Sequence, residues 1–170
     1  MQGLFDRPLA ALSAWLADTA LSHLLQAVDW LVPAIQTLHI LAVALVISSV
    51  LLLSLGVFGL HGREQPLSRT VARFSPGIRW GLPALLVSGA LMIAAEPDRA
   101  LPNPAFQIKM ALLLLATGLT WSYARDLRRA PATAPGAPRS LVLRAAAAVA
   151  LGLWTAVLIA GRWIAYTLSR

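Results

Sequence analysis

The sequence predicts an all-α integral membrane protein, a four-helix bundle with an N-terminal amphipathic interfacial helix. Of its 170 residues, 58% are hydrophobic and only 12% are charged, whereas a soluble domain carries about 25% charged residues. Uncharged apolar stretches recur along the chain, and a bilayer-spanning helix needs roughly 20 such residues. A water-soluble bundle would need a polar stripe on every helix, which segments 40–60 and 111–120 lack. We therefore expect a single membrane domain over residues 1–170.

The N-terminal segment 9–31 has the periodicity of an amphipathic helix. Its polar face carries Asp18, Ser22 and Asp29. Its apolar face carries Leu9, Leu12, Leu16, Ala20, Leu24, Ala27 and Leu31. Such a helix lies in the plane of the membrane interface. We expect it on the outer leaflet, before the chain turns into the membrane at Pro33.

The spanning helices are predicted from the positions of the charged residues. No Asp, Glu, Lys or Arg occurs from Trp30 to Gly62, and three later stretches also lack these charged residues. The third helix is expected to begin at Asn103-Pro104, because Asn is a good N-cap and Pro suits the first helical position. The predicted spans are 33–60, 79–96, 104–125 and 140–166. The intervening segment 126–139, which contains RAPATAPGAP, is predicted to be a flexible cytoplasmic linker.

The distribution of arginine predicts the orientation in the membrane. Segments 61–79 and 125–144 together hold nine arginines against two acids, Glu64 and Asp126. The positive-inside rule places both segments in the cytoplasm, so both termini are expected in the periplasm. These segments have few aromatic residues on which bases could stack, so we expect no nucleic-acid partner. The lipid bilayer is the predicted partner of the apolar helices.

Motifs of soluble enzymes are absent from the sequence, which has no phosphate loop, no GxGxxG, no HExxH and no GxSxG. It also has no cysteine, which excludes thiolate nucleophiles, thiolate metal sites and disulfides. Enzyme activity by the chain alone is therefore the least supported class. Polar residues inside the predicted spans are more informative, because they are costly in lipid and usually functional.

A cluster of polar residues is expected at one depth in the outer leaflet. His39 follows Pro33 by six residues, about 9 Å along a helix, and Gln36 shares its face. Each of the other three spans supplies a charged residue at a comparable depth. The predicted cofactor-binding residues are His39, Gln36, Glu96, Lys109 and Arg162. Two alternatives are an ion-pair lock between Glu96 and Lys109 or Arg162, and cations that extend to the interface.

The other two histidines have different expected roles. His23 lies on the apolar face of the interfacial helix and is a candidate second metal ligand beside His39. The alternative is an interfacial imidazole that contacts lipid or backbone. His61 lies about 33 Å further along the helix than His39, so it is interpreted as a loop residue.

Sequence motifs extend over nearly the whole chain. They are IQTLHILAVAL at 35–45, SGALMIAAEPDRALPNPAFQIKMALLLLA at 88–116 and LW…AGRWIAY at 153–166. In these motifs the chain resembles a family of small four-span bacterial inner-membrane proteins catalogued as a domain of unknown function. The family commonly has Asp-Leu-Arg at the inner end of its first helix, where this chain reads SLGVFG. A more distant likeness is to the copper-resistance membrane protein D family. The resemblance implies location in the bacterial inner membrane.

Three functions are compatible with these features. The first is binding of b-type haem for electron transfer, with His39 as axial ligand and Lys109 and Arg162 at the propionates. The second is copper handling or transport through imidazole and thioether ligands. The third is a cofactor-free accessory or anchor subunit of a membrane or periplasmic oxidoreductase. The first and third imply another membrane or periplasmic redox protein as a partner, and the chain is also compatible with oligomers.

Overall fold

The fold is entirely helical in the part of the chain that the structure describes. This computed structural model describes residues 3–60, 67–101, 103–129 and 140–167. They contain no strand, which confirms the predicted all-α fold. The helices in chain order are α1 (Gly3–Ala17), α2 (Ala20–Ala27), α3 (Leu31–Phe58), α4 (Leu67–Ala95), α5 (Pro97–Ala100), α6 (Pro104–Arg129) and α7 (Leu141–Thr167).

Four of these helices are long and apolar enough to cross a membrane. Their membrane-length segments have mean hydropathies of 2.7 in α3, 1.6 in α4, 1.3 in α6 and 2.0 in α7. At 1.5 Å per residue, helices of this length match the roughly 30 Å hydrocarbon core of a bilayer. The chain is therefore a multi-pass membrane protein.

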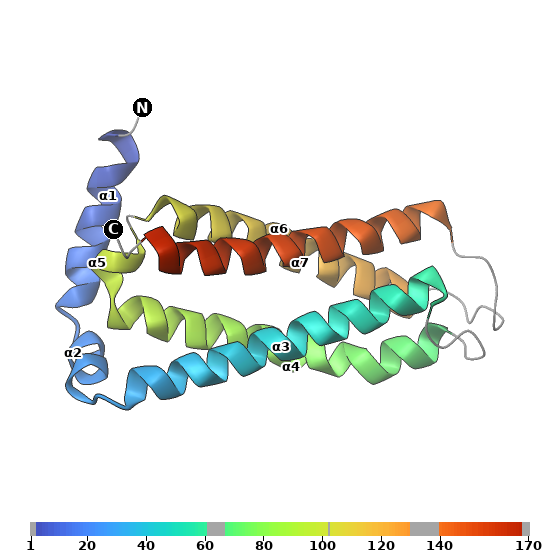
Figure 1. The fold of residues 1–170 in the computed structure, drawn as a ribbon, viewed down its shortest axis with the longest axis horizontal. Coiled ribbons are helices and arrows are strands. Elements are labelled where there is room, and N and C mark those ends of the chain that lie inside the picture. The colour runs from blue at the N-terminus through green and yellow to red at the C-terminus, as the bar shows by residue number, and fades with distance from the viewer. Residues whose placement is uncertain (1–2, 61–66, 102, 130–139, 168–170) are drawn as a thin grey trace.

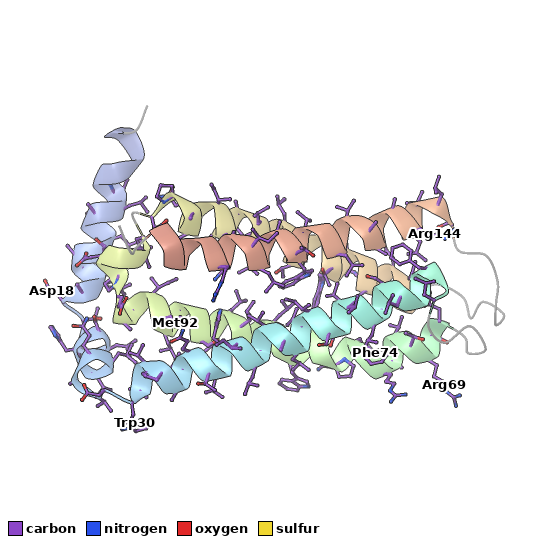
Figure 2. All side chains as sticks on the ribbon, in the orientation of Figure 1. Asp18, Trp30, Arg69, Phe74, Met92 and Arg144 are labelled. Carbon is purple, nitrogen blue, oxygen red and sulfur yellow. The ribbon has the colours of Figure 1, made fainter. Side chains whose placement is uncertain are left out.

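The two ends of the bundle differ in the helices that they carry (Figure 1). At one end, which we call the capped end, α1, α2 and α5 lie near the start of α3 and the end of α7. The opposite end, which we call the arginine end, carries Arg69 on α4 and Arg144 on α7 (Figure 2). Asp18 and Trp30 lie at the capped end in the same view. The ends of the helices that flank both arginine-rich segments thus lie on one side of the bundle.

The N-terminal segment forms two helices, where one continuous helix over 9–31 was predicted. Thr19 separates them, because its Oγ1 donates to the carbonyl of Leu16 at 2.7 Å and accepts from the Ser22 amide at 3.2 Å. A threonine in this position caps the first turn of a new helix. Helix α1 runs across the end of the bundle (Figure 1), with Leu12 and Trp15 exposed. That orientation is compatible with the expected position at the membrane interface.

The second spanning helix also differs from its predicted bounds, since α4 begins at Leu67 and not at 79. Residues 67–78 form an amphipathic part of the helix. Its arginines are exposed on one face, and its other face is buried against α3. The buried residues are Leu67, Thr70, Val71 and Ile78. Tertiary packing therefore extends the helix through a segment whose charges suggested a loop. Similarly, residues 126–129 continue α6, and the rest of the predicted linker lies outside the described residues, as does His61.

The bundle consists of two helix pairs, α3 with α4 and α6 with α7. Helices α3 and α4 approach closely because Gly81 offers no side chain at their contact. A Cβ atom at Gly81 would lie 2.6 Å from Val46 Cγ2, and Val46 is fully buried. Gly77 plays the same role opposite Ser49 and Leu45. Glycine at such contacts allows helix backbones to approach closely within a membrane.

A buried hydrogen bond joins the second pair, and its removal gives a first prediction. Trp154 Nε1 on α7 donates to Thr120 Oγ1 on α6 at 3.0 Å. We expect Trp154→Phe to lower the free energy of unfolding in detergent by about 1 kcal/mol, because interhelical bonds in membranes contribute about that much. A double-mutant cycle with Thr120→Val measures the coupling. Strictly additive effects of the two substitutions would contradict the bond.

Candidate functional site

A polar layer interrupts the apolar interior near the capped end. The large apolar core fills the rest of the bundle. Its buried residues nearest to the polar layer are Ala42, Leu85, Leu113 and Val157. Beyond the layer lies a second apolar cluster, whose buried members Leu25, Ile35, Ala94 and Ala95 come from α2, α3 and α4. The residues that define the polar layer are His39 on α3, Ser88 and Gly89 on α4, Lys109 on α6 and Gly161 on α7.

The central contact of the polar layer joins α3 to α4. His39 Nδ1 lies 2.9 Å from Ser88 Oγ. The Ser88 hydroxyl itself donates to the carbonyl of Ala84 at 2.6 Å. A hydroxyl has one proton, so when Ser88 donates to Ala84 it accepts from His39; we assign the ring proton to Nδ1 on this basis. His39 Nε2 is then unprotonated and directs its lone pair away from Ser88.

Gly89 makes room for the imidazole ring of His39. A Cβ atom at this position would lie 3.4 Å from His39 Cε1, at the close limit of ordinary van der Waals contact. His39 is half-buried, and its Nε2 makes no hydrogen bond with the described residues. The ring is thus held at Nδ1 by Ser88, and the backbone carbonyl of Leu85 is a further polar neighbour. This is the arrangement in which second-shell hydrogen bonds hold histidine ligands of metals.

Lys109 brings a positive charge to the polar layer from the other helix pair. Its side chain crosses toward α7, where a Cβ at Gly161 would lie 3.6 Å from both Cε and Nζ. The residue is half-buried and makes no ion pair or hydrogen bond within the described part of the chain. It interacts electrostatically with His39. Two basic groups therefore share one low-dielectric region without a carboxylate that pairs with Lys109.

The remaining predicted site residues lie around this layer. Gln36 is exposed on α3, one turn from His39, and Glu96 is exposed where it caps α5. Arg162 is exposed on α7 next to Gly161. His23 is exposed on α2, outside the spanning helices. The structure therefore brings together His39 and Lys109, with the other four at the periphery of the capped end.

Sequence reasoning missed Ser88 and Gln26. Serine within a spanning helix usually bonds to its own backbone, and only the pairing of α3 with α4 brings Ser88 to His39. Gln26 Nε2 donates to the Ala95 carbonyl at 3.0 Å and to Ser22 Oγ at 3.1 Å. These bonds attach α2 to the end of α4. No local sequence signal indicates either contact.

The chain was compared with known protein families, curated proteins and solved structures. No curated protein and no solved structure matches it, so the likeness to the copper-resistance membrane protein D family stays a prediction. The family of unknown function DUF6644 matches residues 27–167. The match covers all four spanning helices and every residue of the polar layer, and excludes α1 and most of α2. The chain belongs to this family of unknown function, DUF6644.

Proposed function

We propose that the polar layer binds b-type haem and that the protein transfers electrons at the membrane. The observation that carries the proposal is the 2.9 Å contact of His39 Nδ1 with Ser88 Oγ. With the ring proton assigned to Nδ1, Nε2 is available as a lone-pair donor. A haem in a helical bundle needs an axial imidazole of this kind. When bound, its iron would exchange single electrons with a redox partner.

The charges of the capped end fit the other requirement of haem, a pair of cations for its two propionates. Lys109 supplies a half-buried ammonium whose charge acts on His39. Arg162 is on α7, next to the glycine against which Lys109 lies. Cations placed in or near a low-dielectric site stabilise carboxylates more strongly than in water. We assign Lys109 and Arg162 as the propionate partners, with Glu96 and Gln36 at the rim.

The same features favour haem over a copper ion. Copper draws all its ligands from the protein, and the described residues contain no group of three His, Asp, Glu or Cys side chains that could hold a metal. The porphyrin supplies four ligands to its iron, so one protein imidazole is sufficient. An ammonium near His39 would also repel a bare metal cation, whereas it attracts the haem propionates.

The experiment is a visible absorbance spectrum with elemental analysis of the full chain, purified from cells supplied with haem. We expect a Soret band and about one iron per chain. Copper at one per chain without a Soret band would support copper handling instead. Co-purification of one large partner, with neither metal on this chain, would support the accessory-subunit function and overturn the haem proposal.

The orientation of the bundle is part of the proposal. We infer that the arginine end faces the cytoplasm of a bacterial inner membrane, so that the polar layer and both termini face the periplasm. A reporter fused after Gly136 should behave as cytoplasmic, and one fused at the C-terminus as periplasmic. The reverse pair of signals would place the polar layer on the cytoplasmic side.

A further inference from the structure

The exposed face of α4 near the arginine end carries aligned arginines. Arg69, Arg73 and Trp80 recur at the spacing that places side chains on one side of a helix. All three are exposed, and Trp80 retains 69% of its accessible surface. Arg69 projects away from the bundle in Figure 2. Arg79 precedes Trp80 and lies about 100° further around the helix. We call Arg69, Arg73, Arg79 and Trp80 together the α4 arginine strip.

Aromatic rings accompany two of these guanidinium groups. Arg79 Cζ lies 5.8 Å from the ring centroid of Trp80, and Arg73 Cζ lies 5.7 Å from that of Phe74. Contacts at this distance are cation–π interactions. None of the three arginines makes an ion pair with a described acid. Their charge is therefore available to an anion outside the chain.

The same side of α4 continues as an apolar surface toward the capped end. Its exposed residues are Trp80, Pro83, Leu86 and Val87. Because α4 spans the membrane, this surface contacts lipid chains. The strip from Arg69 to Arg79 covers about 15 Å of the helix axis at 1.5 Å per residue. Helical side chains lean toward the N-terminus of their helix, which for α4 is the arginine end.

We propose that the α4 arginine strip is a binding site for an anionic phospholipid. The phosphate would be held by Arg69 and Arg73, which lie one turn apart on the same face of α4, because the planar guanidinium binds phosphate in a bidentate manner. The acyl chains would lie along Trp80, Pro83 and Val87. Topology alone accounts for arginine on this side of the membrane. It does not require Arg69 and Arg73 to share one helix face with the exposed Trp80 and the apolar surface that follows it.

The test compares two lipids with identical acyl chains, phosphatidylglycerol and phosphatidylcholine, by native mass spectrometry of the purified full chain in detergent. Wild-type protein should bind phosphatidylglycerol about 10-fold more tightly, given the attraction of each basic residue for anionic lipid. Arg69→Gln/Arg73→Gln should remove this preference. The matched control is Arg125→Gln/Arg144→Gln, which removes two exposed arginines from α6 and α7 at the same end and should retain it.

Two outcomes would overturn the proposal. One is equal affinity of wild-type protein for both lipids, and the other is an equal loss of preference in the control. If Arg69→Gln/Arg73→Gln does not fold, Arg69→Lys/Arg73→Lys keeps the positive charges and removes the planar guanidinium groups. A lysine variant with undiminished preference would contradict phosphate recognition by these guanidinium groups.

Discussion

His39→Ala should abolish the Soret band of the purified protein. The imidazole is the one iron ligand that we assign to the described chain, and alanine cannot replace it. Ser88→Ala keeps the imidazole and removes the acceptor at 2.9 Å from Nδ1. Loss of such a second-shell partner typically weakens metal affinity by 10- to 100-fold. The Ser88 variant should therefore retain the chromophore at high haem concentration and release it on dilution.

His23→Ala is the matched control for the loss of an imidazole at the capped end. His23 is exposed on α2, so its removal should leave the spectrum unchanged. Loss of the Soret band in the His23 variant would make His23 the second axial ligand considered from the sequence. An unchanged spectrum in the His39 variant would exclude His39 as the axial ligand. Titration of each variant with haemin, followed by absorbance, measures both outcomes.

Gly81→Val should destabilise the bundle more than any other single substitution considered. Even its Cβ would lie 2.6 Å from Val46 Cγ2, a distance that real Cβ contacts do not reach. Because Val46 is fully buried, relief requires separation of α3 from α4. Overpacking of this kind costs about 1–3 kcal/mol or more. Unfolding by denaturing detergent, followed by circular dichroism, measures the loss.

Gly152→Val provides the corresponding control within another spanning helix. No atom lies within 4 Å of a Cβ built at Gly152, so the added side chain points into open space on α7. Its effect should stay within about 0.5 kcal/mol, as for a substitution away from any packed feature. Equal destabilisation by the two variants would contradict the claim that Gly81 allows α3 and α4 to approach closely.

The fold could be predicted because its signals are local. Apolar stretches of sufficient length predict spanning helices whatever their packing, and Asn103-Pro104 marks the start of α6 directly. Two boundaries could not be predicted in this way. The extension of α4 back to Leu67 depends on contact with α3, and the break at Thr19 depends on a single cap that the apolar periodicity of 9–31 conceals.

The candidate site was predictable in its residue types and less so in its contacts. The cost of polar groups in lipid points to His39 and Lys109. Depth along a helix does not determine which way a side chain points around it. Ser88 and Gly89 join the site because α4 turns them toward α3, whereas Gln36 on the face of His39 remains exposed. The pairing of the helices decides which residues belong to the polar layer, and no local sequence pattern indicates that pairing.

The most direct test of iron ligation by His39 is rescue of His39→Gly by free imidazole. Glycine leaves space where the ring was, and exogenous imidazole would supply the missing nitrogen ligand. We expect that the variant has no Soret band after haemin addition, and that millimolar imidazole restores a band like that of the wild type. A wild-type spectrum without imidazole, or no chromophore in wild-type protein supplied with haem, would contradict ligation by His39.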